Sequence, residues 1–229
     1  NLLVTRFPDS QITIADFSPE MYDATTKGLK IIKPFSEKWI NSNWLFLSIP
    51  EQSFDIVIGD RVLEQFFSRK DEQKFFDKIR NLLHPEGIFI SRFRLRNDKL
   101  AGIPGWRIIA ATFKESQRSS KGIPLALVWR LRDAYTNESS RIIDCASIKQ
   151  SFEECIQKQG PMPKIITAFK LTKKDMSNFP FRWVYASPSK AEFEVLYSPF
   201  FTVVQERCST DYLDARQYPI FIFKPRKIS

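Results

Sequence analysis

One carboxylate of this 229-residue chain stands where it could bind a ligand. Ile12–Asp16 is a short apolar run that ends on this carboxylate, and the residues after it, Ser18 to Glu20, suit the first turn of a helix. A carboxylate at the carboxyl end of a parallel strand faces the crevice of an open α/β sheet, where it can accept hydrogen bonds from both hydroxyls of a ribose. The alternative is that Asp16 is only a helix cap and a surface charge.

The elements that would position Asp16 follow one another at the spacing of a βαβ unit. Residues 53–59 (SFDIVIG) predict a buried strand, and residues 71–83 carry apolar side chains at helical spacing. A turn at residues 84–87 then leads into a second apolar strand at residues 88–91. This order favours a parallel sheet with helices on its faces, and it places His84 at the amino edge, away from the crevice.

Three segments resemble the successive motifs of class I S-adenosylmethionine-dependent methyltransferases, in particular the small-molecule branch. They are ITIADFSPEM, SIPEQSFDIVIGDRVLEQF and FFDKIRNLLHPEGIFIS. The tail is similar to that fold's last helix (residues 191–196) and closing β-hairpin (residues 200–205 and 218–223). The resemblance implies an α/β, doubly wound, Rossmann-like methyltransferase sheet. Its core would comprise residues 1–91 and 190–229, and residues 92–189 would form a mainly helical insertion after the fifth strand, acting as a lid over the substrate.

The glycine-rich loop of that family is missing from the sequence. Only seven glycines occur, and none precedes Gly28. Because the family's first strand lies in the middle of the sheet, its loss would leave two half-sheets with unpaired inner edges. We therefore expect a strand and a glycine loop upstream of Asn1. The alternative is a degenerate relative that no longer binds the cofactor.

The resemblance implies S-adenosylmethionine as cofactor and assigns it six contacts. Asp16 would hold the ribose, and Phe17 would pack beside the adenosine. Asn43 and Trp44 would surround the adenine. Gly59 and Asp60 would line the wall near the methionine moiety. Asn43 stands where the family usually has an acidic residue, but its amide oxygen can still accept a hydrogen bond. Plain core packing is the alternative for Trp44.

The sequence identifies no catalytic residue as clearly as it identifies the cofactor contacts. Asp60 and Glu64 come after the fourth strand and are weak candidates for a general base, and in-line positioning supplies much of the rate of methyl transfer. Arg92 and Arg94 leave the crevice edge of the fifth strand and are expected to meet an acidic group on the substrate. Trp106 and Trp129 would wall an apolar or aromatic acceptor pocket; as an alternative, they form the insertion's own core.

The composition of the chain indicates which kinds of binding partner to expect. The net charge of +9 is spread along the chain, so nucleic acid is less favoured than a small-molecule acceptor. No apolar run is long enough to span a membrane. The three cysteines have no metal-ligand spacing and are typical of a reducing, cytoplasmic compartment. The oligomeric state stays open.

The sequence therefore predicts a cytoplasmic methyltransferase of small-molecule biosynthesis, with S-adenosylmethionine as cofactor and an O, N or C nucleophile as acceptor. Two alternatives stay open. An RNA or protein methyltransferase would need a continuous basic surface that runs from residues 92–99 across the lid. A non-catalytic binding or scaffold module would keep the fold without the cofactor.

Overall fold

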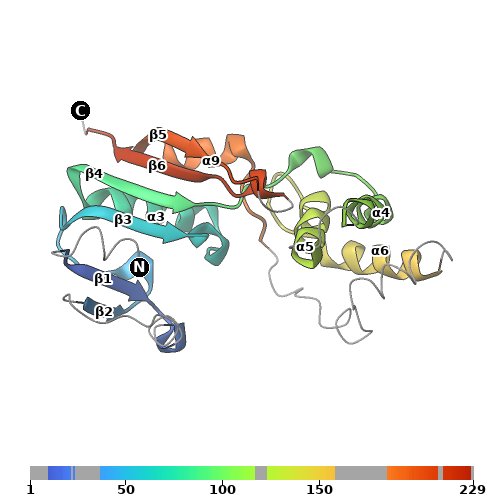
Figure 1. Cartoon of the computed structure of the whole chain (residues 1–229), viewed down its shortest axis with the longest axis horizontal. Helices are drawn as coiled ribbons and strands as arrows, with labels where there is room; N and C mark the ends of the chain where they lie inside the picture. Colours follow the sequence, from blue (N-terminus) through green and yellow to red (C-terminus); the bar gives the residue numbers. More distant parts are fainter. Residues whose placement is uncertain are drawn as a thin grey trace.

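The computed structural model describes residues 10–21, 23, 37–116, 123–157, 185–210 and 214–227. Two short apolar runs of the sequence, residues 165–169 and 183–186, lie outside these ranges in full and in their first half, respectively. Figure 1 shows all the labelled strands gathered in one lobe, and the helices of the insertion, α4, α5 and α6, in a second lobe beside it.

The described strands form two separate sheets. Strands β1 (Ile12–Asp16) and β2 (Glu37–Asn41) pair in parallel. The second sheet has the order β3-β4-β6-β5, in which β3 (Phe54–Asp60) and β4 (Leu83–Arg92) are parallel. β6 (Ile220–Pro225) is antiparallel to both β4 and β5 (Phe201–Arg207), which confirms the predicted closing hairpin. The arrows of β1 and β3 point the same way (Figure 1), and no strand of the described part lies between them.

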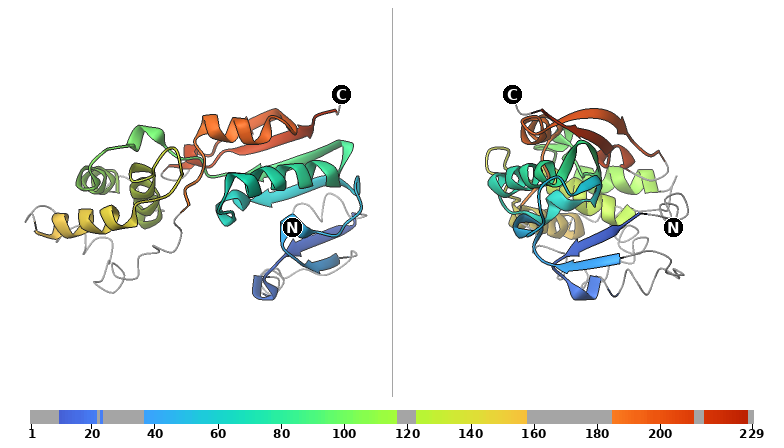
Figure 2. Two further views of the ribbon diagram at one scale, coloured as in Figure 1. Left: turned by 180° about the vertical axis from the view of Figure 1, so that it is seen from behind. Right: turned by 90° about the vertical axis from the view of Figure 1, so that its left-hand side faces the viewer.

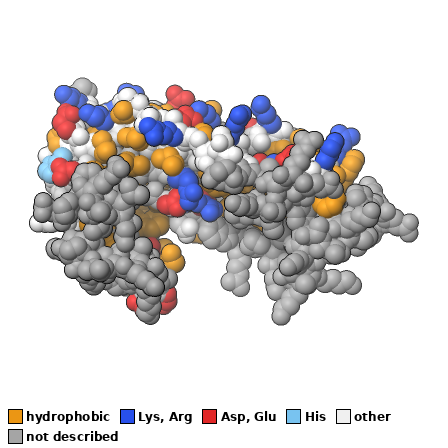
Figure 3. Space-filling view, viewed as in Figure 1, with side chains coloured by type: hydrophobic (Ala, Val, Ile, Leu, Met, Phe, Trp, Pro, Cys, Tyr) orange, Lys and Arg blue, Asp and Glu red, His pale blue; other side chains and the backbone are white. Residues whose placement is uncertain are grey.

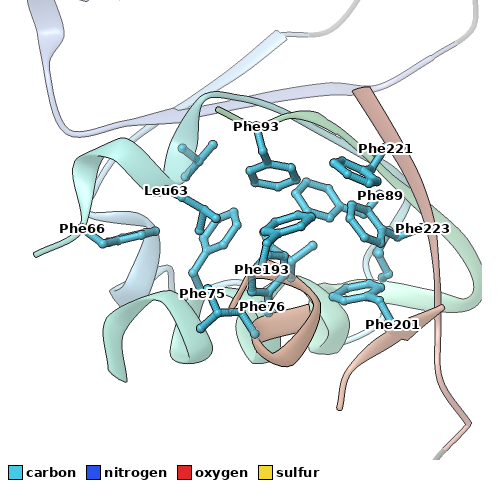
Figure 4. Close-up of a cluster of buried hydrophobic side chains, with 14 of the residues drawn as sticks. Leu63, Phe66, Phe75, Phe76, Phe89, Phe93, Phe193, Phe201, Phe221 and Phe223 are labelled. Atoms are coloured by element: carbon cyan, nitrogen blue, oxygen red, sulfur yellow. The ribbon is translucent and has the colours of Figure 1, made fainter. Parts of the chain in front are cut away.

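Phenylalanines fill the space between the four-stranded sheet and the two helices on one of its faces. These helices are α3 (Arg69–Leu82) and α9 (Lys190–Tyr197), which lie side by side across that face in both views of Figure 2. Strand alternation sends Phe89 and Phe223 toward the helices, and both are 0% exposed. Figure 4 shows the side chains that meet there, among them Phe75, Phe76, Phe93, Phe193, Phe201 and Phe221.

The opposite face of the same sheet is apolar but open. Ile56, Ile58 and Ile220 are 43%, 55% and 42% exposed. Figure 3 shows hydrophobic side chains grouped over this part of the sheet. The described helices of this lobe therefore cover one face only.

Two sequence expectations need correction in their detail. Residues 84–87 do not form a turn between helix and strand; they belong to β4 as a bulge, since Phe54 pairs with Leu83 and Ile56 with Ile88. The apolar spacing of residues 142–159 predicts a helix over that range, but the helix starts later, as α6 (Cys145–Gln157). The oxygens of Asp144 accept hydrogen bonds from the Ser147 backbone and hydroxyl (3.0 and 2.6 Å), so Asp144 caps the helix.

The insertion has its own core, and that core is aliphatic. Helices α4 (Gly105–Ser116) and α5 (Ile123–Ala134) pack with α6. Their buried cluster consists of Ile108, Ile109, Leu127, Leu131, Ala134, Ile143, Ile148 and Ala186. Neither Trp106 nor Trp129 belongs to it, so the alternative that these tryptophans form the insertion's core is not supported.

A buried ion pair joins the insertion to the strand lobe. Arg141 donates to both carboxylate oxygens of Glu72 on α3, at 2.6 and 2.9 Å, and Glu72 is 0% exposed. Burial raises the pKa of the Glu72 carboxyl, while Arg141 opposes that rise. Breaking such a pair leaves an uncompensated buried charge, so Glu72 and Arg141 fix how the insertion sits on the sheet.

Candidate functional site

The main candidate site is a cavity of about 490 Å³ between the facing edges of β1 and β3. Along most of its length its walls are apolar, with Phe54, Ile56 and Val57 on one side and Leu47 and Ile49 near its base. Its polar end is the carboxyl edge of the strands, where Asp16 and Asp60 stand. Asp16 and Asp60, the two carboxylates that the sequence assigns to the cofactor, thus both line this cavity.

Asp16 is only partly used by its own chain. Its Oδ1 accepts a hydrogen bond from the Ser18 backbone N–H at 2.9 Å, which is the capping role that the alternative interpretation gave it. Its Oδ2 has no partner among the described residues. Since a carboxylate can accept about four hydrogen bonds, capping and ribose binding are compatible at Asp16.

Two aromatic side chains stand beside Asp16. The Trp44 indole Nε1 donates to the Ala15 carbonyl at 2.8 Å, and this bond fixes the ring at the end of β1. Phe17 meets Trp44 edge to face with 6.2 Å between ring centroids, and it is 57% exposed. Both rings line the cavity, so they present an apolar surface next to the carboxylate, as an adenine would require.

The other two predicted cofactor contacts differ from each other. Asn43 does not line the cavity; its Oδ1 accepts from the Leu45 backbone N–H at 2.9 Å and caps the short helix η1 (Trp44–Phe46). Gly59 does line it. A Cβ on Gly59 would come within 3.0 Å of Val62 Cγ2 and 3.1 Å of Ser91 Oγ, so packing alone already requires a glycine there.

Both candidate bases are held by arginines. Asp60 receives two hydrogen bonds of 2.8 Å from Arg92, in a bidentate pair that is exposed to solvent. The Glu64 carboxylate is bound by both Nε and Nη2 of Arg61, and its side chain is 5% exposed. Arg61 itself adopts a left-handed backbone conformation (φ 54°), which is a sign of local strain at the end of β3. Neither carboxylate is arranged as an available proton acceptor.

The arginines of residues 92–99, which we expect at the crevice edge, are paired with carboxylates. Arg92 pairs with Asp60, and Arg96 pairs with Asp98 and Glu192. Arg94 is 2% exposed and donates to Asp133 at 2.7 Å, so it points into the protein and not toward a surface ligand.

The two predicted substrate tryptophans lie in different places. Trp106 is 43% exposed on α4 and lines neither this cavity nor the smaller one described below. Trp129 on α5 lies among three guanidinium groups, with its ring centroid 4.4 Å from Arg94, 4.7 Å from Arg132 and 5.6 Å from Arg61. Only Trp129 therefore lies beside the residues that follow β3.

Several lining residues could not be assigned from the sequence. Met21 and Gln65 stand at the polar end of the cavity, and Leu47 and Ile49 line its base. Met21 was within reach, because it lies one helical turn beyond Ser18 and its backbone N–H bonds to Ser18 Oγ at 3.2 Å. The others follow irregular segments whose direction no periodic pattern sets.

Two further findings bear on the class of protein. Among the described residues, no cluster of His, Cys, Asp and Glu could hold a metal ion. Within the same ranges, no helix is both long and apolar enough to cross a bilayer.

Comparison with known proteins gives the class. Residues 1–87 match the family model described as "Methyltransferase domain". No curated protein resembles the chain significantly. Residues 1–87 are thus similar to a methyltransferase domain, and they include the segments that resemble class I S-adenosylmethionine-dependent methyltransferases.

Solved structures agree at the level of the fold. The PH0226 protein from Pyrococcus horikoshii OT3 superposes with a TM-score of 0.53 at 16% identity, over 98% of this chain and 76% of its own. A SAM-dependent methyltransferase from Methanosarcina mazei gives 0.51 at 10% identity, over 100% and 87% of the two chains. The predicted α/β methyltransferase fold is therefore confirmed.

Proposed function

We propose that this protein transfers a methyl group from S-adenosylmethionine to a small-molecule acceptor at the carboxyl edge of β1 and β3. The observation that carries this proposal is the meeting of Asp16, Phe17, Trp44, Gly59 and Asp60 in the wall of one cavity. Five of the six cofactor contacts that the family resemblance implies thus lie together. Asn43 is the exception, and we leave the adenine amine without an assigned partner.

In this proposal the open Oδ2 of Asp16 accepts from the ribose hydroxyls, and Phe17 and Trp44 cover the adenine. The bound cofactor supplies an electrophilic methyl group on a sulfonium. Because Asp60 and Glu64 are both held by arginines, the protein's contribution to rate would be positioning of the acceptor in line with that methyl, rather than removal of a proton.

We also propose that the cavity takes a strand as well as the cofactor. The facing edges of β1 and β3 are unpaired within the described residues, and unpaired strand edges between apolar walls favour the addition of another strand. We propose that residues outside the 229 of this sequence supply that strand, together with the glycine loop that the family resemblance implies. The strand would complete the methyltransferase core that residues 1–91 and 190–229 form. The exposed face of Ile56, Ile58 and Ile220 supports the same proposal.

The ion pairs of the basic segment, residues 92–99, favour a small-molecule acceptor over RNA or protein. Arg92, Arg94 and Arg96 are each paired with a carboxylate, so the continuous basic surface that the nucleic-acid alternative needs does not form along the described part of this segment. Only a measurement of S-adenosylmethionine binding distinguishes the enzyme from the alternative of a non-catalytic scaffold.

The test is calorimetric titration of S-adenosylmethionine into the protein with its proposed upstream strand and into an Asp16→Ala variant. Loss of a charged acceptor should weaken binding by about 1.5–3 kcal/mol, roughly a tenfold to 150-fold rise in Kd. Asp55→Ala is the matched control, because Asp55 is an exposed carboxylate on β3 that does not line the cavity.

A second variant separates binding from folding. Asp16→Asn keeps an oxygen that can accept from the Ser18 N–H but removes the charge, so its stability should match that of the parent while its affinity falls. If the folded protein binds no S-adenosylmethionine, the enzyme proposal fails and the scaffold alternative stands. If Asp16→Ala binds as tightly as Asp55→Ala, the cofactor lies elsewhere.

A further inference from the structure

A small cavity beside the end of β3 has buried polar atoms in its walls that lack partners among the described residues. Its volume is about 10 Å³, and its walls come from three segments: Leu63 and Glu64 of η2 (Val62–Gln65), Trp129 and Arg132 of α5, and residues 185–187. In the part of the chain that the structure describes, buried atoms of three of its residues have no hydrogen-bond partner: Arg132 Nε, Trp129 Nε1 and Ser187 Oγ. All three groups can donate a hydrogen bond.

The charges around the cavity do not balance. Arg61, Arg94 and Arg132 surround the Trp129 ring, against two carboxylates, and each carboxylate is already paired. Glu64 binds Arg61, and Asp133 binds Arg94. Arg132 is left without a carboxylate partner in the described part of the chain, since its Nη2 donates only to the Tyr185 carbonyl at 3.2 Å.

Arg132 is 6% exposed, so this uncompensated charge is buried. Burial, and next the neighbouring Arg94, lower the pKa of Arg132 to about 10, which still leaves it cationic at neutral pH. A buried cation without a counter-charge is costly, and so is a buried donor without an acceptor. One negatively charged oxygen in the cavity would offset the charge of Arg132 and accept hydrogen bonds from the donors in its wall.

We propose that the cavity formed by Arg132, Trp129 and Ser187 binds one oxygen of a carboxylate, and that this carboxylate belongs to the methyl acceptor. The second part rests on the proposed function. A cavity of about 10 Å³ holds roughly one water-sized atom, which suits a single carboxylate oxygen. Its position fits as well, since η2 directly follows β3, whose last residue, Asp60, lines the cofactor cavity.

The first experiment uses sodium formate, the smallest carboxylate, and measures the thermal unfolding midpoint of the full 229-residue chain. Formate at several times its Kd should raise Tm by about 2–4 °C, while sodium chloride at equal ionic strength should not. Arg132→Met should abolish the formate shift. It should also unfold no earlier than the parent without formate, because it removes an uncompensated charge.

Two further variants keep this result interpretable. Arg130→Met removes another arginine of α5, but one that is paired with Glu115 and Asp214 and does not line the cavity, so it should lower Tm and retain the formate shift. Ser187→Ala removes one donor with little change of shape and should weaken the formate response even if Arg132→Met does not fold. Three results overturn the site: no formate shift in the parent, an equal shift with chloride, or a shift that survives in both cavity variants.

The second experiment identifies the source of the carboxylate. Transfer of tritium-labelled methyl from S-adenosylmethionine is compared for aromatic carboxylic acids and their primary amides, which share shape but not charge. We expect at least a tenfold preference for the acids, lost in Arg132→Met. Equal turnover of amides overturns the acceptor assignment. A formate shift without any methyl transfer leaves the site standing and counts against the proposed function instead.

Discussion

The four-stranded sheet β3-β4-β6-β5 and the two-stranded sheet β1-β2 differ in what covers them. Phe89 in β4 is 0% exposed beneath α3 and α9, and its ring contacts those of Phe75, Phe93 and Phe223. Every residue of β1 is only partly buried, and residues 38–41 of β2 include no buried side chain. Two paired strands alone are marginally stable in water, whereas a sheet packed on helices is not.

The difference shows where the molecule depends on something added. Strand β1 carries Asp16, yet among the described residues its packing comes mainly from one neighbour, β2, and from contacts of Ala15 with the core. Whatever enters the cavity between β1 and β3, whether strand or cofactor, would stabilise the weaker sheet and organise the site in one step. Stability and cofactor binding should therefore be coupled at β1 and independent at β4.

The largest expected effect is on amide hydrogen exchange. Amides of β4 and β6 should open only by global unfolding, whereas those of Ile14 and Ala15 should exchange at least about a thousandfold faster. Exchange followed by mass spectrometry on the 229-residue chain, corrected for intrinsic rates, measures this directly. Equal protection in both sheets would remove the basis of the comparison.

A large effect is also expected from truncating one side chain in each sheet. Phe89→Ala leaves a cavity among the ring cluster and should cost about 3–5 kcal/mol of unfolding free energy in urea. Ile14→Ala should cost about 1 kcal/mol or less, because Ile14 is only partly buried and belongs to no core cluster of the described part. Phe89→Leu, which retains most of the volume, should fall between them. Similar costs for the two alanine variants would mean that β1 is as well packed as β4.

Local signals in the sequence predicted most of the fold. Apolar runs and their spacing located β1, β3 and α3 to within one or two residues, because strand and helix periodicity depends on near neighbours. The family resemblance located the closing hairpin to within two residues. The same locality explains the error at α6, where the capping by Asp144 was readable from its distance to Ser147 and was overlooked. Asn43, two residues before Leu45, is a similar case of a short polar side chain that bonds its own backbone.

The candidate site was predictable only in part. Asp16 was found because its place at a strand end is itself a local property. The state of the arginines was not, since Arg94 meets Asp133 at a separation of 39 residues and Arg141 meets Glu72 at 69. A basic cluster in sequence gave no sign that each charge is met from a different element, and no pattern marks Arg132 as the one left over.

The smallest effect compares two serine caps, one for each sheet. Ser189 forms a capping box with Glu192 at the start of α9, and it is 4% exposed. Ser189→Ala should lower the free energy of the main unfolding transition by about 1 kcal/mol, and Ser189→Gly should lower it by only a few tenths, because glycine leaves the backbone amides open to water.

Ser18 caps the turn after β1 through its bond to the Met21 N–H. Ser18→Ala should therefore change the free energy of the main transition by less than about 0.5 kcal/mol. The cap at Ser18 belongs to a segment that opens before the core does, and its loss should instead speed the exchange of amides around Asp16. A main-transition loss at Ser18 as large as that at Ser189 would show that the two sheets unfold as one unit.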